Sequence, residues 1–258
     1  QEGKIRYHKN IKTSREEFLG AVAPYRDDII VGVESTYAWY WLADLCEDEN
    51  IHFLLGHALY LKAVHGGKTK NDKTDSKTLA FILRGGNFPT AYVYPRKMRA
   101  TRDLLRRRMY LARKRAAVMA HMQNTNSQHN LGPFEKRLKY KSNRPGIIDR
   151  FADPSVHKTI EVDLELLDFY DELLRDLELY ILKSARVDDP VSLHLLQTIH
   201  GVGDILSLVM MYEIEDIRRF KRVQEFLSYC RLVKCPRESA GKRYPSTNSK
   251  IGNAYLKW

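Results

Sequence analysis

Short apolar runs separated by polar segments mark the first part of the chain. The run DIIVGVE (28–34) is continuously apolar over its centre, which is typical of a strand covered on both faces. IHFLL (51–55) predicts a second, shorter strand. KIRYHKNI (4–11) alternates between polar and apolar residues and TAYVY (90–94) is rich in strand formers, so both predict further strands. The pattern predicts a sheet in which 28–34 is a central strand.

Helical signals alternate with these strands. The capping box SREE (14–17) predicts a helix over 15–25, and TYAWYWLADLCED (36–48) predicts an amphipathic helix. A third helix is expected to begin within KNDKTDSKTLA (70–80). Alternating strands and helices predict an α/β sandwich over residues 1–95.

Two long segments of opposite charge follow. Residues 96–115 contain ten Arg or Lys and one acid, Asp103, whereas residues 161–178 contain eight acids and one base, Arg175. Both segments carry apolar residues at spacings of three and four, the stripe of a long helix. The stripes are Leu105, Met109, Ala112, Ala116 and Met119 in the first segment, and Leu166 or Leu167, Tyr170, Leu173 or Leu174, Leu177 and Ile181 in the second.

A polar stretch containing Gly and Pro (124–146) separates these segments and predicts a loop, so the two helices are expected to form an antiparallel coiled-coil hairpin over residues 96–190. The arginines could pair with the acids across the hairpin or contact nucleic acid, and charge counting does not separate the two. The loop has basic residues of its own with no acidic segment nearby except Glu135. These are the predicted phosphate contacts: Lys136, Arg137, Lys139, Lys141 and Arg144.

The composition narrows the class of protein. The chain has 258 residues, enough for one to three domains, and its 43% hydrophobic and 29% charged residues are a globular balance. No apolar run reaches the roughly 20 residues of a membrane span, and the three cysteines include no CxxC pair. We therefore expect a cytoplasmic protein without a zinc site. The net charge of +11 and the pI of about 9.5 indicate a polyanionic partner.

Three carboxylates stand where metal chemistry on nucleic acid would need them. Glu34 follows the predicted central strand at its carboxyl end, where open α/β sheets carry their sites. Asp72 and Asp75 are three residues apart, so they share one face of a helix turn. Mg²⁺ prefers oxygen ligands, and two ions about 3.5–4 Å apart would stabilise a phosphoryl transfer. The alternative is local: Asp72 as a helix N-cap with Asp75 at N3, and Glu34 as a solvated loop residue.

The C-terminal block contains a glycine turn and a serine loop. TIHGVGDILSLVMMYEI (198–214) has the form of a helix–hairpin–helix, in which Gly201 and Gly203 let backbone amides face a phosphate; a tight helix connection is the alternative. Ser239 lies near several cations but beside no obvious base, so chemistry alone favours a turn residue over a nucleophile. The cations, which are predicted nucleic-acid contacts, are Arg237, Lys242, Arg243 and Lys250.

Three stretches together resemble the DEDD transposases of bacterial and archaeal insertion sequences, the IS-one-ten group. VGVESTYAWYWLADL (31–45) is similar to that family's strand-end glutamate followed by an aromatic-rich helix. KNDKTDSKTLA is similar to its Lys-x-Asp-x-x-Asp motif, with Ser76 where alanine is usual. The stretches HGVGDILSLVMMYEIEDIRRF (200–220), LSYCRLVKCPRESAGKR (227–243) and SKIGNAYLK (249–257) are similar to its C-terminal transposase domain.

The resemblance implies three parts: an RNase H-like (RuvC-like) domain over 1–95, a coiled-coil arm over 96–190 and a mainly α-helical transposase domain over 191–258. It also implies a bacterial or archaeal recombinase that acts on DNA as a homo-oligomer, a dimer or a tetramer. The family's sites are built between subunits, and a structured non-coding RNA serves as guide.

The resemblance also implies roles for single residues. Glu34, Asp72 and Asp75 correspond to the second, third and fourth acids of a Mg²⁺ site, and Ser239 corresponds to the serine that becomes linked to DNA. The family's first aspartate lies on a strand ahead of KIRYHKN, and further helices follow NAYLKW, so we expect a fragment truncated at both ends. Three of four acids would hold metal weakly, and this chain alone is expected to be inactive in strand exchange.

Two rival functions stay open at this point. In a RuvC-like junction-resolving nuclease only the acids act and Ser239 is structural. In a non-catalytic nucleic-acid-binding protein neither acts. Ala240, which separates Ser239 from Gly241, is a local departure from the family's Ser-Gly pattern.

Overall fold

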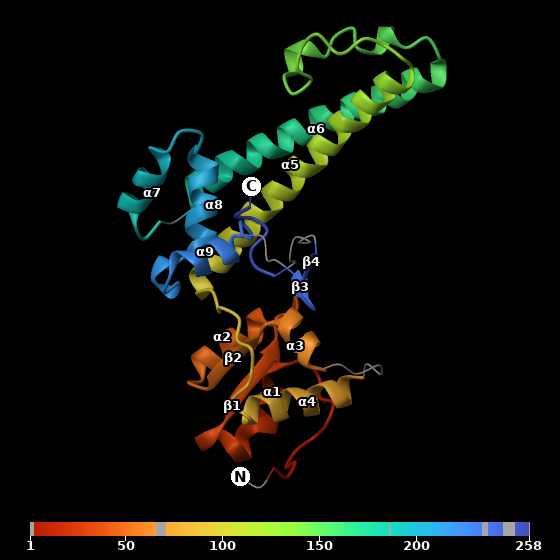
Figure 1. The fold of residues 1–258 in the computed structure, drawn as a ribbon. Helices are drawn as coiled ribbons and strands as arrows, with labels where there is room; N and C mark the ends of the chain where they lie inside the picture. The colour runs from red at the N-terminus through yellow and green to blue at the C-terminus, as the bar shows by residue number, and fades with distance from the viewer. Residues whose placement is uncertain (1–2, 66–70, 186, 234–236, 245–250, 258) are drawn as a thin grey trace. The chain divides into compact units, whose positions relative to one another are not determined.

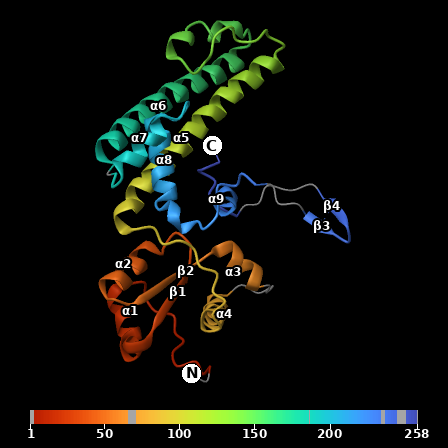
Figure 2. The same cartoon turned by 60° about the vertical axis from the view of Figure 1, so that its left-hand side comes forward.

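The computed structural model (Figures 1 and 2) describes residues 3–65, 71–185, 187–233, 237–244 and 251–257. The chain divides into two compact units, Gln1–Lys97 (unit 1) and Met98–Trp258 (unit 2), each of which is described by itself. Among the described helices, none combines the length and the apolar character that a membrane span requires.

A two-stranded parallel sheet organises unit 1. Strands β1 (Ile30–Glu34) and β2 (His52–Gly56) pair along their whole length, as the two apolar runs predict. Helix α2 (Tyr40–Asp48) covers one face of the sheet and packs on Leu55. Because the strands are parallel, their carboxyl ends meet at one edge.

The remaining helices of unit 1 follow from local signals. Ser14 caps the first one, since its side chain accepts a hydrogen bond from the backbone N–H of Glu17 (3.3 Å), which confirms the N-cap half of the predicted capping box. The backbone N–H of Ser14 donates to the Lys12 carbonyl oxygen (2.9 Å) and not to Glu17. The helix after β2 was not predicted. The elements are α1 (Arg15–Val22), the 3₁₀ segment η1 (Ala23–Asp28), α3 (Ala58–His65) and α4 (Asp72–Arg84).

Two predicted strands are absent from the described part of unit 1. Residues 4–11 form no strand, because alternation of side chains does not by itself supply a neighbouring edge to pair with. Residues 90–94 contribute one bridge, from Thr90 to Gly56, since the prolines on both sides of the stretch have no N–H to extend a ladder. Within the described residues β1 is therefore paired with β2 alone and is not a central strand.

Two long antiparallel helices form the arm of unit 2 (Figures 1 and 2). Ion pairs set their register: Arg108 binds Glu178, and Arg115 binds Asp171, seven residues away on each helix. The helices are α5 (Arg96–Gln128) and α6 (Pro154–Ser184). Apolar residues on α6 are buried at every seventh position: Ile160, Leu167, Leu174 and Ile181.

The apolar seam on α5 differs from the predicted one near its middle. Leu105 and Met109 are buried as predicted, but Ala116 is exposed. Arg115 takes the half-buried place instead, because its guanidinium binds Asp171 on the facing helix. A charged residue in the seam is invisible to a pattern that counts only apolar positions.

The segment that joins α5 to α6 (129–153) has a small core of its own. Leu138, Ile147 and Phe151 are buried against Met122 at the end of α5. Two 3₁₀ turns shape the segment, η2 (Lys141–Asn143) and η3 (Ile148–Arg150). These apolar residues are spaced too irregularly for a periodic pattern to reveal them.

Short helices and a hairpin complete unit 2. Leu208 and Tyr212 of α8 share a core with Leu105 and Ile181, so α8 packs on the base of the arm. The elements are α7 (Pro190–Gln197), α8 (Asp204–Ile214), η4 (Ile217–Arg219), α9 (Val223–Tyr229), β3 (Arg237–Ser239) and β4 (Lys242–Tyr244).

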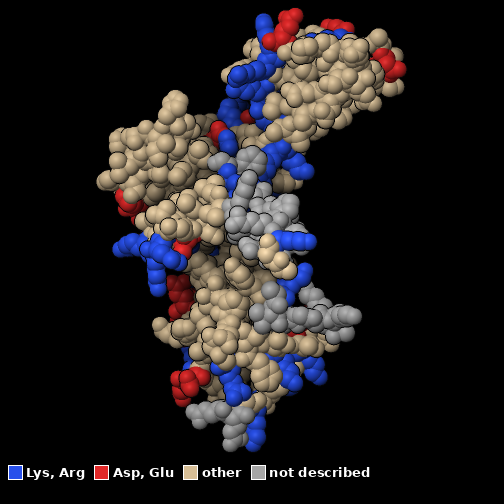
Figure 3. Space-filling model, in the orientation of Figure 1, with Lys and Arg blue, Asp and Glu red and all other residues tan. Residues whose placement is uncertain are grey.

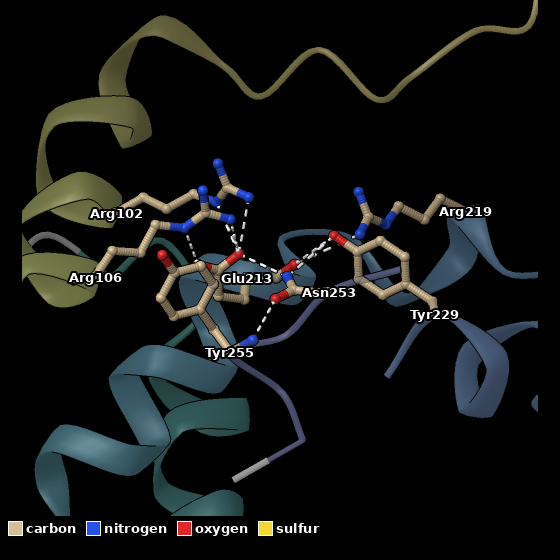
Figure 4. A network of polar contacts seen from close by, with 7 residues as sticks. All are labelled: Arg102, Arg106, Glu213, Arg219, Tyr229, Asn253 and Tyr255. Atoms are coloured by element: carbon tan, nitrogen blue, oxygen red, sulfur yellow. Dashed lines mark hydrogen bonds and ion pairs between the residues drawn. The ribbon is translucent and has the colours of Figure 1, made fainter. Parts of the chain in front are cut away.

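A buried carboxylate joins several of these elements (Figure 4). Glu213 of α8 is 1% exposed and accepts hydrogen bonds from Arg102 Nε (3.0 Å) and Arg106 Nη2 (2.9 Å) of α5. Asn253 Nδ2 donates to the same carboxylate (2.7 Å), and the hydroxyl of Tyr229 on α9 donates to the Glu213 carbonyl oxygen (3.4 Å). Burial alone would raise the pKa of Glu213, but the Arg106 hydrogen bond and the charges of both arginines outweigh it and hold the pKa below its ordinary value.

Candidate functional site

Glu34 lies at the carboxyl end of β1, on the face of the sheet that α4 covers. A Cβ atom at Gly32 would lie 3.1 Å from Leu83 Cδ2 of α4, so that face of β1 packs against α4. Side chains two residues apart on a strand share a face, so Glu34 lies on the same face as Gly32. The glutamate and the helix that carries both aspartates therefore belong to one side of the sheet.

Asp72 and Asp75 open α4 without capping it. The N-cap is Asn71, whose side-chain oxygen accepts a hydrogen bond from the backbone N–H of Lys73 (2.8 Å). The alternative in which Asp72 caps the helix is wrong by one residue, because Asn and Asp are equally good caps and the sequence does not choose between them. Both aspartates lie in the first turn, where the helix dipole favours negative charge.

A polar hollow of about 760 Å³ lies beside Asp72. In its wall, His8 Nε2 and Ser76 Oγ are 3.3 Å apart, so the N-terminal segment contacts α4 one turn after Asp72. The lining residues are His8, Lys9, Asn10, Asn71, Asp72, Lys73 and Ser76. Positive and neutral polar groups thus surround this aspartate.

The three predicted acids are not gathered around one point. In the described parts of the chain, no group of three or more His, Cys, Asp or Glu is close enough to share a metal ion. The contact between β1 and α4 at Leu83 is eight residues beyond Asp75, or about 12 Å along the helix axis. Their carboxylate oxygens are the donors that Mg²⁺ prefers, so the donor chemistry fits and the metal site at Glu34, Asp72 and Asp75 stays a prediction.

His57 is a residue at this edge that the sequence reasoning missed. It follows β2 directly, as Ser35 follows β1, and Ser35 Oγ accepts a hydrogen bond from the backbone N–H of Ala58 (3.3 Å). The His57 Nδ1 atom is buried and has no hydrogen-bond partner among the described residues. The strand-end rule that singles out Glu34 applies equally to His57 and would have found it.

Ser239 is the last residue of β3 in a tight hairpin. It pairs with Lys242, and the two residues between them, Ala240 and Gly241, have φ angles of 51° and 74°. Positive φ at both central positions is the signature of a type I′ turn. The extra alanine between Ser239 and Gly241 is therefore part of a regular two-residue turn.

The predicted contacts around this serine are described only in part. Lys242 is exposed. The side chains of Arg237, Ser239 and Arg243, and the whole of Lys250, lie outside the described part of the structure. The nucleophilic role of Ser239 and the phosphate contacts of its neighbours stay predictions.

The basic residues of the 129–153 segment fall into two groups. Arg144 is 6% exposed and its guanidinium donates to Asp168 and Asp171, while Lys141 pairs with Asp168 (2.9 Å). The expectation that these two residues lack acidic partners is wrong, because α6 runs antiparallel to α5 and its acids Asp168 and Asp171 therefore lie next to the loop. Exposed positions, which stay candidates for phosphate contacts, are held by Lys136, Arg137 and Lys139.

In the turn between α7 and α8, the backbone conformation favours glycine only at the first of the two glycine positions. Gly201 has a φ of 88°, a conformation that favours glycine, and Gly203 is the N-cap of α8 with no side-chain hydrogen bond. Asp204 occupies the first turn of α8 and accepts a hydrogen bond from Gln197 Nε2 (2.9 Å). A carboxylate already lies near these amides, and phosphate binding at Gly201 and Gly203 stays a prediction.

Exposed cations also gather over η4 and the start of α9 (Figure 3). The side chains of Arg218 and Arg222 are largely exposed although each contacts an acid nearby in sequence, and Lys221 is exposed as well. The run RRFKR (218–222) signals this cluster, and the sequence reasoning missed it.

Two protein families match the chain. The first, a family of DEDD transposases described as "Transposase", matches residues 1–129, half of the 258 residues. The second, described as "Transposase IS116/IS110/IS902 family", matches residues 193–258. No curated protein matches the chain.

These matches agree with the fold of unit 1. A DEDD transposase domain has an RNase H-like fold, acts on DNA and usually depends on divalent metal ions. A parallel strand pair with α2 on one face and α4 on the other is consistent with that fold. The chain belongs to the IS110 family of insertion-sequence transposases, which are DNA recombinases.

Proposed function

We propose that this transposase cuts and rejoins DNA with a Mg²⁺ site formed by Glu34, Asp72 and Asp75 and with Ser239 as nucleophile. The observation that most supports the acidic site is the side of the sheet on which Glu34 lies, which is the side that α4 covers. Asn71 caps α4, and this leaves both aspartates of the first turn without a capping role. A glutamate on the opposite face could not meet them without refolding of the sheet.

The residues divide the chemistry between them in this proposal. Mg²⁺ held by the carboxylates would supply positive charge at the reacting phosphate. Ser239 Oγ gives up its proton and forms a bond to phosphorus, while the bond from phosphorus to one deoxyribose oxygen breaks and that oxygen takes up a proton. Attack by a hydroxyl of a second strand on the same phosphorus releases the serine and joins the strands.

A guide RNA and a homo-oligomer belong to the same proposal. The net charge of +11 and the exposed cations of the 129–153 segment and of 218–222 support contact with the phosphates of nucleic acid. The resemblance to RNA-guided relatives supports the proposal that this protein binds a guide RNA. It also supports the proposal that its sites are formed by residues of more than one subunit.

The serine is tested by trapping the covalent intermediate. The Ser239→Ala variant, with Ser142→Ala as an exposed control in the same unit, is incubated with Mg²⁺, DNA carrying the ends of the element and the element's transcript. The expected inactivity of this chain alone concerns complete strand exchange, of which the adduct is the first step. We expect a protein–DNA adduct on a denaturing gel for the parent chain and for Ser142→Ala, and none for Ser239→Ala. Cleavage that persists without an adduct in Ser239→Ala would instead identify a junction-resolving nuclease.

The acids are tested by direct metal binding. The Asp72→Asn variant is compared with Asp176→Asn, which removes a carboxylate from an exposed position on α6. We expect Mn²⁺ binding, followed by electron paramagnetic resonance, to weaken at least about tenfold in Asp72→Asn alone, because loss of a partner that only supports a ligand already costs about that much. Equal Mn²⁺ binding in both variants, with DNA binding that falls steeply with salt, would favour a non-catalytic nucleic-acid-binding protein.

A further inference from the structure

The arginines of α5 serve two different purposes. Arg102, Arg106, Arg108 and Arg115 bind carboxylates of unit 2, so they hold the arm together. Two other cations of the same helix, Arg107 and Lys114, make no such pair among the described residues. They flank an aromatic ring at Tyr110.

Tyr110 and its two neighbours form what we call the cation–tyrosine face: Arg107, Tyr110 and Lys114. Arg107 Cζ lies 5.0 Å and Lys114 Nζ 5.5 Å from the centre of the Tyr110 ring. Residues three and four apart on a helix are neighbours on its surface, so the three side chains lie together. Tyr110 is 46% exposed, and no ion pair is found for Arg107 or Lys114 among the described residues.

The same helix shows how such cations behave when the chain itself supplies the ring. Arg106 Cζ lies 4.4 Å and Arg113 Cζ 5.7 Å from the ring of Tyr255, which comes from the C-terminal segment and is partly buried. There the aromatic partner is internal and the cations stabilise the fold. At Tyr110 both cations and ring belong to one helix surface, and almost half of the ring faces solvent.

A second pair of the same type lies close by on unit 2. Lys139 Nζ is 4.7 Å from the centre of the Tyr140 ring, which is 51% exposed. Arg115 Nη2 donates to the Lys139 carbonyl oxygen (2.7 Å), so this pair is tied to α5 one residue beyond Lys114. The hydrogen bond from Lys139 and its charge lower the pKa of Tyr140, as expected in a positive environment.

We propose that the cation–tyrosine face binds an unpaired stretch of nucleic acid, with a base stacked on Tyr110 and the adjoining phosphates on Arg107 and Lys114. A flat ring between cations matches a partner that alternates flat bases with negative charges, and base–aromatic stacking of this kind does not depend on sequence. A base that stacks on the ring displaces the Lys114 ammonium, which exchanges a weak cation–π contact for a phosphate. A duplex cannot bind in this way, because its bases are already stacked on one another.

The cation–tyrosine face shares no residue with the acids or the serine of the proposed function, so either proposal can fail without the other. The proposed ligand is a single strand of nucleic acid, and DNA and RNA offer the same alternation of bases and phosphates. Displaced strands of recombining DNA and loops of a structured RNA both offer it, and the experiment distinguishes the two.

The test measures binding of labelled oligonucleotides by fluorescence anisotropy. The probes are single strands of about 15 nucleotides, as DNA and as RNA, together with the DNA duplex and a DNA strand in which abasic sites replace the bases. Tyr110→Ala is compared with Tyr180→Ala, which removes an exposed tyrosine from α6, and Arg107→Ala/Lys114→Ala is compared with Arg175→Ala, an exposed arginine of α6. Circular dichroism confirms that each variant is folded.

We expect Tyr110→Ala to weaken single-strand binding roughly 5- to 150-fold, the range for loss of one stacked base, and to leave binding of the abasic strand and of the duplex unchanged. The double variant should lower the slope of log K against log salt by about 1.4, or 0.7 for each phosphate contact. The control variants should change neither quantity. A larger effect with RNA than with DNA assigns the face to RNA, and the reverse assigns it to a DNA strand.

Two results would overturn the proposal. If Tyr110→Ala weakens binding of the abasic strand as much as that of the normal strand, no base stacks on the ring. If the double variant and Arg175→Ala change the salt slope equally, the two cations of α5 make no phosphate contact of their own.

Discussion

Glu213 is the carboxylate on which the base of the arm depends, and its replacement by glutamine has a predictable cost. The glutamine has almost the same shape, but it places an NH₂ group where one carboxylate oxygen accepts hydrogen bonds from Arg102 and Arg106. Arg102 is buried in the fold, so its charge would lose the Glu213 carboxylate in a place that is largely closed to water. The perturbation therefore removes a carboxylate from a buried charge while it creates no cavity.

The magnitude follows from the burial. Removing one partner of a buried, hydrogen-bonded ion pair costs about 3–5 kcal/mol. The amide oxygen of glutamine still accepts one hydrogen bond, and Asn253 can reorient, so we expect a loss near the lower end, about 3 kcal/mol. For a folding unit of this size each kcal/mol lowers the melting temperature by about 2–4 °C, which predicts a shift of about 6–12 °C.

Thermal unfolding followed by circular dichroism at 222 nm measures this shift, because α5 and α6 of unit 2 dominate the signal. The control is Glu178→Gln, the same substitution at a carboxylate that pairs with Arg108 but is about one-third exposed. Screening by solvent should limit the effect of the control to about 0.2–1 kcal/mol.

The dependence on pH gives a second readout with a definite sign. The folded-state pKa of Glu213 is lowered, so its contribution to stability is fully present above the ordinary value of 4.5 and is lost as the pH falls through the lowered pKa. The difference in melting temperature between the parent chain and Glu213→Gln should be constant from pH 6 to 8 and should shrink in that acidic range. A shift no larger than that of Glu178→Gln, or one that grows below pH 4.5, would refute the reasoning.

Three further predictions concern single positions. Asn71→Ala should destabilise the first turn of α4 by about 1 kcal/mol, because Lys73 N–H loses its acceptor, and amide hydrogen exchange should accelerate there while the rest of unit 1 is unchanged. Burial raises the pKa of the Cys46 thiol to about 11, so at pH 8 iodoacetamide should modify it at least tenfold more slowly in the folded chain than in urea, as read by mass spectrometry; equal rates would contradict its burial. Gly252→Ala should cost at least about 2 kcal/mol, since Gly252 has a φ of 94° and a Cβ there would lie 2.6 Å from the Tyr229 carbonyl oxygen; Gly132→Ala, which meets nothing within 4 Å, should stay within about 0.5 kcal/mol in the same urea titration.

Local signals predicted much of unit 1 correctly. The N-cap at Ser14 and the apolar runs of β1 and β2 depend on residues that are neighbours in sequence, and the structure has all three. The strand predicted over 4–11 fails for the opposite reason. A strand needs a partner edge, and alternation within one segment cannot report whether such an edge is present.

Charge patterns were informative about the arm and misleading about its loop. The opposite charges of the two long helices predicted one class of contact that exists, such as Arg108 with Glu178. The same counting treated Arg144 as unpartnered because it looked only along the chain. The acids that bury Arg144 lie 24 and 27 residues later on α6, and only the antiparallel return of that helix brings them to it.

The candidate acidic site was partly predictable. The strand-end rule located Glu34, and helix periodicity placed Asp72 and Asp75 on one turn. Packing between Gly32 and Leu83 determines which face of the sheet carries Glu34 and where along that face α4 lies. No local pattern in the sequence encodes this packing. The sequence also does not choose between Asn71 and Asp72 as the cap of α4, because Asn and Asp cap helices equally well.

The seven-residue repeat of buried positions on α6, from Ile160 to Ile181, sets how an arm of this type can change in length during evolution. Inserting seven residues into each helix would add one more layer and about 10.5 Å of reach, and the loop at the far end would keep its orientation. An insertion that is not a whole number of heptads would turn that loop about the long axis of the arm by roughly 100° for each extra residue. Reach is therefore adjustable in steps, and homologues with longer or shorter arms are expected to differ by whole heptads.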